Sequence, residues 1–217
     1  MTKLGNLMIL GDSYSTYKGY NPEGYAVWYT PEGRPQTDLR LVEDTWWYRV
    51  LDNTDSSLVL NSSYSGTTIC NTGYGGTDYK SISFVGRFDK RCAEGFFKEQ
   101  KIDTLLIFGG TNDTWAGSPL GELKLSGHTP EELYSVLPAF GYLLSRVKSE
   151  LPDTRVIVLI NDVLSEGITE GMITACRALN VEYLPLVSIT KNEGHPTIRG
   201  MKEIAEQLLA YLEKSEN

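Results

Sequence analysis

Four short polar segments of this chain hold residue types that could together transfer an acyl group. A serine hydroxyl is a poor nucleophile until a base takes its proton, and histidine is the side chain that titrates nearest neutral pH. The chain has only two histidines, and the pattern favours Ser13 as nucleophile and His195 as base. The segments are Gly11-Asp12-Ser13, Gly66 in a Gly- and Ser-rich stretch, Asn112 after two glycines, and Gly194-His195-Pro196.

Acyl transfer also needs fixed donors for the oxyanion that forms on the attacked carbonyl. The backbone N–H groups of Ser13 and Gly66 and the side-chain amide of Asn112 could supply three. Losing one such donor typically costs about 3 to 4 kcal/mol of transition-state stabilisation. Gly66 has no Cβ, so its backbone can approach a substrate closely.

Short apolar runs predict the strands that would position these residues. Continuous runs of this kind are typical of parallel strands buried on both faces of a sheet. Ligands collect beyond the carboxyl ends of such strands, so residues that follow different strands would meet at one edge. The runs cover residues 6–10, 58–61, 103–108 and 155–160, with a weaker fifth at 181–187.

Helix signals lie between the apolar runs. Residues 44–51 predict a helix start, and Thr129-Pro130-Glu131-Glu132 is a capping box with proline at the first helical position. Pro138 would kink or restart the following helix, and the last helix is predicted to begin near Thr197. This alternation predicts a three-layer α/β/α sandwich around a doubly wound parallel sheet of about five strands. No linker, repeat or low-complexity tract divides the chain, so we expect residues 1–217 to form one domain.

The motifs and their order resemble the SGNH hydrolase superfamily, the GDSL-type esterases and lipases. Four matches in order over nearly the whole chain are specific, although each short string alone would be weak. The resemblance implies a flavodoxin-like fold, no metal, no cofactor, and ester hydrolysis through an acyl-enzyme. It implies Ser13 as nucleophile, His195 as base, and Ser13, Gly66 and Asn112 as oxyanion-hole donors. The matching segments are Gly11-Asp12-Ser13, Gly66, Gly109-Gly110-Thr111-Asn112-Asp113 and His195-Pro196.

One position departs from the family pattern. The family usually has an aspartate three residues before the histidine, and here that residue is Asn192. Glu193 is the predicted replacement for this triad acid; a backbone carbonyl or the Asp162 carboxylate are the alternatives. The third member of a triad orients the imidazole and stabilises its cation without taking the proton, so a dyad is also an option.

Two stretches without periodicity, residues 14–43 and 61–80, are expected to be functional loops. The first is dense in aromatic residues. Aromatic faces with polar tips suit stacking on sugars or packing around an acyl chain, so Tyr14 and Trp46 are predicted substrate contacts. The alternative is that these rings pack the loop onto the protein or form a subunit interface.

Composition excludes several classes of function. A net charge of −8 repels phosphate backbones, so no nucleic-acid partner is expected. No apolar run approaches the ~20 residues of a membrane-spanning helix, and we expect no membrane partner. Three widely separated cysteines suggest neither disulfides nor a zinc site, and an N-terminus without a signal-peptide core predicts a cytoplasmic protein.

These observations predict a serine esterase that hydrolyses a small acyl ester, acetyl above all, of a carbohydrate or other polar small molecule. A lysophospholipase or thioesterase acting on longer acyl chains is the enzymatic alternative. A non-catalytic carbohydrate-binding relative is the alternative from another class, supported by Asn192 alone. The oligomeric state stays open.

Overall fold

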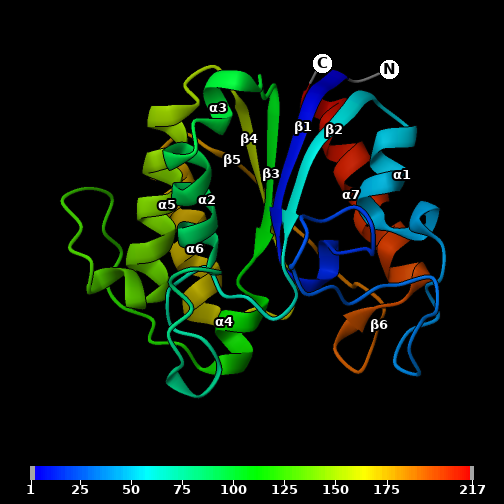
Figure 1. The fold of residues 1–217 in the computed structure, drawn as a ribbon, viewed down its shortest axis with the longest axis horizontal. Helices are drawn as coiled ribbons and strands as arrows, with labels where there is room; N and C mark the ends of the chain where they lie inside the picture. The colour runs from blue at the N-terminus through cyan, green and yellow to red at the C-terminus, as the bar shows by residue number, and fades with distance from the viewer. Residues whose placement is uncertain (1–2, 216–217) are drawn as a thin grey trace.

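The computed structural model describes residues 3–215 and contains a five-stranded parallel sheet between two layers of helices (Figure 1). The strand order is β2-β1-β3-β4-β5, and every neighbouring pair is parallel. The predicted three-layer α/β/α, flavodoxin-like fold is therefore confirmed. The strands are β1 (Lys3–Gly11), β2 (Asp55–Ser63), β3 (Thr104–Gly109), β4 (Arg155–Ile160) and β5 (Glu182–Pro185), and a separate hairpin pairs β6 (Lys191–Asn192) with β7 (His195–Pro196).

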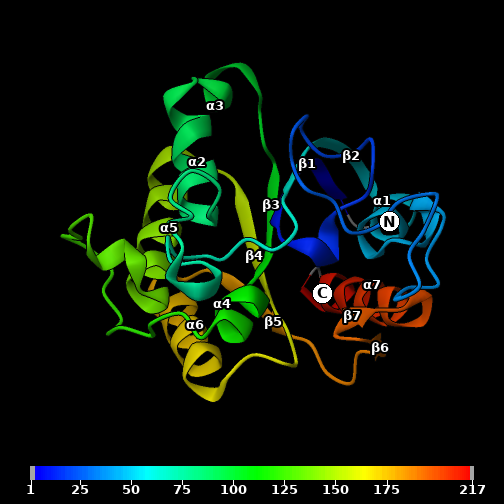
Figure 2. The same ribbon diagram turned by 60° about the horizontal axis from the view of Figure 1, so that its bottom comes forward.

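Helices cover both faces of the sheet, as Figure 2 shows from a second direction. One layer contains α1 and α7, and the other contains α2, α5 and α6. The helices are α1 (Trp46–Asp52), α2 (Phe84–Ala93), α3 (Phe96–Glu99), α4 (Thr111–Ala116), α5 (Val136–Glu150), α6 (Glu166–Ala178) and α7 (Ile198–Ser215).

The apolar runs became strands because both of their faces are covered. Along β1, Met8 and Leu10 enter the core on the α5 side, while Leu7 and Ile9 enter the core on the α7 side. All four side chains are fully buried. A strand buried on both faces cannot alternate apolar with polar residues, which is why the sequence shows an unbroken run.

The structure corrects the helix start expected from Thr129-Pro130-Glu131-Glu132. Half of the capping box forms, because the Thr129 N–H donates to the Glu132 carboxylate at 2.7 Å. The chain then makes only a 3-10 turn over Glu132–Tyr134, and α5 begins at Val136. Pro138 is the third residue of α5, where a missing N–H costs nothing, so it restarts the helix and does not kink it.

Other boundaries shift by a few residues. The helix predicted at 44–51 begins at Trp46, because Thr45 accepts a hydrogen bond from the Tyr48 N–H and caps it. The weak fifth strand is shorter than predicted, at Glu182–Pro185. The last helix begins at Ile198, one residue after the expected start.

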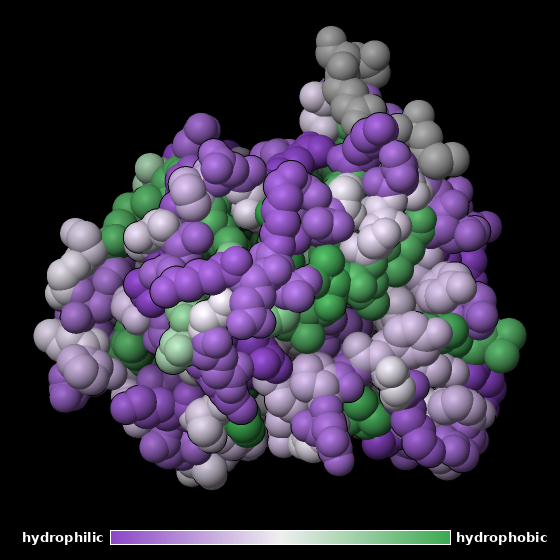
Figure 3. Space-filling view, turned by 45° about the horizontal axis from the view of Figure 1, so that its top comes forward, coloured by the Kyte–Doolittle hydropathy of each residue, from purple (hydrophilic) through white to green (hydrophobic). Residues whose placement is uncertain are grey.

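The surface is mostly polar on the side of the molecule that carries the start of β1 and the end of α7, with a strip of hydrophobic residues among the polar ones (Figure 3). Over residues 3–215, none of the helices combines the length and apolar character needed to cross a bilayer.

A buried arginine links the carboxyl ends of the first two strands to α2. Arg87 is 1% exposed, and its guanidinium donates to the carbonyl oxygens of Gly11 (3.0 Å), Ser62 and Ile82 (2.8 Å) and to Thr67 Oγ1 (3.2 Å). Burial lowers the pKa of Arg87 to about 10. A buried charge is tolerated only when hydrogen-bonded, and here the acceptors are strand-end carbonyls.

We predict that Arg87→Met lowers the free energy of unfolding by about 3–5 kcal/mol, because it leaves buried carbonyl oxygens without donors. Urea titration followed by circular dichroism measures the loss. Lys90→Met on the same helix is the matched control; its exposed ion pair with Glu94 should contribute below about 1 kcal/mol. Equal losses in the two variants would contradict the role given to Arg87.

Candidate active site

The structure brings Ser13 and His195 together although they lie 182 residues apart in the chain. Ser13 opens a 3-10 turn, Ser13–Ser15, directly after β1. Its Oγ lies 3.0 Å from Nε2 of His195, and both residues are buried. Asp12 caps the turn by accepting the Tyr14 N–H at 3.0 Å. This is the geometry that proton transfer from a serine hydroxyl to an imidazole requires.

His195 is carried by the two-residue hairpin between β6 and β7. Its turn residues, Glu193 and Gly194, have φ of 45° and 82°, the left-handed backbone that such tight hairpins need. The Glu193 carbonyl oxygen then lies 3.5 Å from Nδ1 of His195, a long contact for a hydrogen bond. The Glu193 side chain is exposed. The structure thus brings the carbonyl of Glu193 to the imidazole, and not the carboxylate that was predicted as triad acid.

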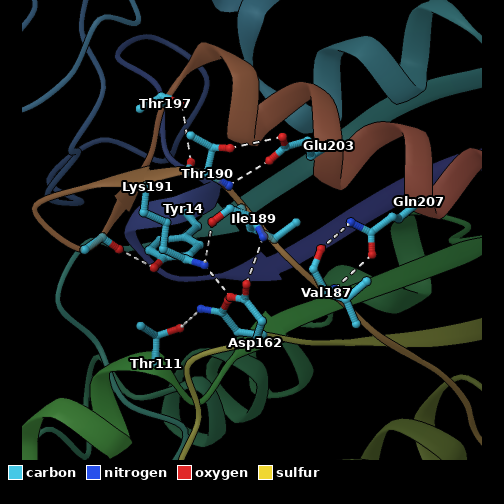
Figure 4. A network of polar contacts seen from close by, with 12 residues as sticks. Tyr14, Thr111, Asp162, Val187, Ile189, Thr190, Lys191, Thr197, Glu203 and Gln207 are labelled. Carbon is cyan, nitrogen blue, oxygen red and sulfur yellow. Dashed lines mark hydrogen bonds and ion pairs between the residues drawn. The ribbon is translucent and has the colours of Figure 1, made fainter.

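The other residues considered for that role bind elsewhere. Asn192 Nδ2 donates to the Gln36 carbonyl at 3.0 Å. The Asp162 carboxylate forms an ion pair with Lys191 and accepts the Ile189 N–H at 2.9 Å (Figure 4). Over residues 3–215, no carboxylate is hydrogen-bonded to His195. Asn192 and Asp162 instead fix the segment that leads into the hairpin.

Gly66, one of the predicted oxyanion donors, lies on a loop that is hydrogen-bonded to the end of β1. The Tyr64 N–H donates to the Gly11 carbonyl at 3.2 Å, which fixes the start of the loop that carries Gly66. Gly66 has φ of +83°, a conformation that favours glycine, and within the described chain its N–H has no internal acceptor. The requirement at this position is therefore the positive φ, because a Cβ there would meet open space.

Asn112 is held at the start of α4. Its Nδ2 donates to the Thr67 carbonyl at 3.0 Å, next to Gly66, and its Oδ1 accepts the Tyr74 hydroxyl at 2.8 Å. These two bonds fix the plane of the amide and leave its second N–H unpaired among the described residues. The segments that carry Gly66 and Asn112 are therefore hydrogen-bonded to each other.

Tyr14 and Trp46, the predicted substrate contacts, are fully buried in the structure and present no exposed surface to a substrate. The Tyr14 hydroxyl donates to the Gly194 carbonyl, and Trp46 Nε1 donates to Ser15 Oγ at 3.3 Å. An aromatic residue near a site can be buried in the packing beneath it or exposed to a substrate, and the sequence alone does not distinguish these two cases. These rings support the serine turn and the histidine hairpin.

Two exposed aromatic residues that were not predicted lie close to the site, one beside His195 and one against Asn112. Trp115 is 40% exposed, and its ring centroid lies 5.7 Å from that of His195. Tyr74, which bonds to Asn112, is 38% exposed. The position of Trp115 three residues after Asn112, one helical turn along α4, is the signal that could have found it.

Burial sets the charge state of the site. It lowers the pKa of His195 to about 4, with a smaller lowering contribution from the Arg34 guanidinium, while the Glu193 carbonyl opposes the shift. The imidazole is therefore neutral at pH 7 and can accept a proton. Burial also raises the pKa of Asp12 to about 7 and of Asp113 to about 6.

The chemistry available here is that of a serine, a neutral imidazole and amide donors. Residues 3–215 contain no group of three or more His, Cys, Asp or Glu side chains placed to hold a metal ion. Cys70, in the same loop region, is fully buried, and burial raises the pKa of its thiol to about 12. A thiol of that kind is not a competing nucleophile.

Comparison with known proteins agrees with this geometry. The model of the family described as GDSL-like lipase/acylhydrolase matches residues 5–212. No curated protein matches the chain significantly. A protein described as a GDSL-like lipase from Bacteroides ovatus is 40% identical over 98% of this chain and 99% of its own, with a TM-score of 0.89.

Two further solved structures are similar. A protein from Bacteroides uniformis, also described as a GDSL-like lipase, is 39% identical over 97% of this chain and 96% of its own, with a TM-score of 0.89. An acetyl xylan esterase from Butyrivibrio proteoclasticus is 16% identical over 99% of this chain and 64% of its own, with a TM-score of 0.60, which shows a shared fold alone. From the family match over nearly its whole length and the relatives near 40% identity, the chain belongs to the GDSL-like lipase/acylhydrolase family.

Proposed function

We propose that this protein is a serine esterase that removes a small acyl group, acetyl above all, from a carbohydrate or similar polar substrate. The observation that carries the proposal is the 3.0 Å contact between Ser13 Oγ and a buried, neutral His195 Nε2. A fold kept only for binding sugars would not need this pair in hydrogen-bond contact. The geometry therefore favours the catalytic interpretation over the non-catalytic one.

In the proposed reaction, Ser13 Oγ attacks the ester carbonyl carbon while its proton passes to Nε2 of His195. The carbonyl oxygen becomes an oxyanion that accepts hydrogen bonds from the Ser13 and Gly66 N–H groups and the Asn112 amide. Collapse breaks the bond to the alcohol, which takes the proton from His195 and leaves an acyl-enzyme. Water then attacks this ester and gives one proton to Nε2; the bond from the acyl carbon to Ser13 Oγ breaks, Oγ takes that proton back from His195, and the carboxylic acid is released.

Two observations support a polar alcohol moiety. The exposed ring of Trp115 lies beside His195 and that of Tyr74 against Asn112, and flat faces with polar tips suit a sugar ring. A protein of the same fold is named an acetyl xylan esterase. The family description also includes lipases, so acyl-chain length is part of the test.

We predict that Ser13→Ala lowers kcat for p-nitrophenyl acetate by about 1,000-fold or more, because the attacking oxygen is gone. Ser81→Ala, at an exposed serine, is the control and should match the wild type. Equal rates in wild type and Ser13→Ala would end the proposal. A clear preference for octanoate over acetate esters would favour the long-chain alternative.

We predict that kcat/KM for a neutral acetate ester rises with pH through about 4 and stays level to pH 8. Only the neutral imidazole can accept the serine proton, and burial lowers its pKa, so the active form persists to lower pH than an ordinary histidine allows. Acetate release measured from pH 3.5 to 8, over the range where circular dichroism shows a folded protein, checks this. An acid limb near 6.5, the usual value for histidine, would contradict it.

A further inference from the structure

The hairpin that carries His195 is held by a loop from the N-terminal part of the chain. This loop follows the Ser13–Ser15 turn; we define it as residues 16–41 and call it the first loop. The Tyr29 hydroxyl donates to the Pro196 carbonyl at 2.9 Å. The Gln36 carbonyl accepts from Asn192, and Asp38 accepts the Ile198 N–H at 2.9 Å. The first loop therefore fixes the backbone on both sides of the histidine.

The same loop places an indole directly on the imidazole. The rings of Trp28 and His195 are stacked, with centroids 3.6 Å apart and planes within 5° of each other. The backbone N–H of Trp28 donates to Thr16 Oγ1 at 2.8 Å, and the Thr16 hydroxyl donates to the Ser13 carbonyl at 2.9 Å. One threonine thus connects the backbone of Trp28 to the turn that carries Ser13.

Arg34 completes the stack. Its guanidinium carbon lies 4.5 Å from the centroid of the Trp28 ring, and it donates to the Val27 carbonyl at 3.1 Å. Because the imidazole lies face to face with the indole, the guanidinium can only cover the opposite face. The indole is held between a cation on one side and the imidazole on the other.

An imidazole on a fixed backbone keeps two freedoms that matter for proton transfer. Its ring can rotate out of the plane that aims Nε2 at Ser13, and its proton can sit on either nitrogen. Stacking at 3.6 Å removes the first freedom, because rotation would drive ring atoms into the indole. The Glu193 carbonyl, 3.5 Å from Nδ1, favours the tautomer with its proton on Nδ1 and a free lone pair on Nε2.

We propose that Trp28 is the positioning residue that orients the imidazole of His195, in place of the carboxylate that the sequence lacks at position 192, with Arg34 holding the indole. The inference rests on the proposed esterase function. In a triad, the carboxylate both orients the imidazole and stabilises its cation. Here the stack supplies the orientation, and the face of the indole supplies part of the attraction for the cation.

The surroundings of the imidazole decide how its protonation should respond. The Ser13 hydroxyl, the Tyr14 phenol, and the rings of Trp28 and Trp115 pack around it. Arg34 is the charged side chain that disfavours the imidazolium. Removing the guanidinium should therefore make the histidine easier to protonate.

The test compares Trp28→Leu, which removes the flat ring, with Trp28→Phe, which keeps one. Trp28→Leu should lower kcat for p-nitrophenyl acetate by about 10- to 100-fold with little change in KM, because Nε2 is no longer aimed at Ser13. Trp28→Phe should stay within about fivefold of the wild type. Tyr20→Leu, an exposed ring in the same loop, is the matched control and should leave kcat unchanged.

A purely structural role would give a different pattern. It would lower the Tm of both Trp28 variants, and kcat measured on the folded fraction would match the wild type. Loss of kcat in Trp28→Leu at full folding, with rescue by phenylalanine, supports positioning. Wild-type kcat in fully folded Trp28→Leu overturns it. In Arg34→Gln, kcat should fall with little change in KM because the indole loses the cation that packs on it, and the acid limb of kcat/KM should move to higher pH; a wild-type kcat would remove Arg34 from the proposal.

A second readout does not depend on turnover. The chain has two histidines, so the imidazole nitrogens of His195 can be followed by NMR after His128→Gln assigns the spectrum. The wild type should show one tautomer. In Trp28→Leu a ring that is free to rotate moves Nδ1 away from the Glu193 carbonyl, so a mixture of tautomers is expected. If the wild type shows the single tautomer but hydrolyses no ester, the proposed function fails alone. If the wild type hydrolyses acetate and both proteins show the same tautomer, the positioning role fails alone.

Discussion

A histidine base works only if its ring is held against the serine. Among residues 3–215, the His195 ring lies against Ser13 and no carboxylate is hydrogen-bonded to its other nitrogen. Hydrogen bonds with the first loop and with Tyr14 hold the segment that carries His195, at Asn192, Gly194, Pro196 and Ile198. Each is a hydrogen bond from or to backbone. A backbone fixed on both sides leaves only the ring to be oriented, and Trp28 covers its face.

The same logic explains why the long first loop has no regular secondary structure. In helices and sheets the backbone groups bond to one another. In the first loop, side-chain and carbonyl groups bond to the hairpin, as the Gln36 carbonyl and the Tyr29 hydroxyl show. A loop of this length without helix or strand is uncommon in a compact protein unless it serves a function. Here it joins two segments from opposite ends of the chain.

Two buried charged side chains, Arg87 and Asp113, hold the backbone near Ser13 and Gly66. Arg87 bonds to the carbonyls of Gly11 and Ser62 at the ends of β1 and β2, and Asp113 accepts the N–H groups of Ile69 and Cys70. Each charge is hydrogen-bonded to backbone groups at strand ends or in the loop that contains Ile69 and Cys70. These bonds fix the segments that lead to Ser13 and Gly66, so the donors of the proposed oxyanion hole are in place before substrate binds.

The sequence was enough to predict the sheet, because strands buried on both faces leave unbroken apolar runs such as 155–160, which β4 reproduces residue for residue. It was also enough to pair Ser13 with His195, since parallel strands end at one edge. The failures share a cause. Glu132 accepts from Lys124 as well as from its capping partner Thr129, and its segment forms a single 3-10 turn. Local patterns cannot report such tertiary competition.

The same limit applies to the aromatic residues, and it bears on what the site can recognise. Tyr14 and Trp28 are similar in a sequence, yet one is fully buried under the hairpin and the other is stacked on His195. Two of the exposed rings, Trp115 and Tyr74, belong to α4 and to the loop after β2. Because the Tyr74 hydroxyl bonds to the amide of Asn112, a group that lies on Tyr74 lies next to that amide. In the proposed reaction, recognition of the alcohol moiety and stabilisation of the oxyanion would therefore depend on adjoining side chains, and a flat polar substrate such as a sugar would contact both at once.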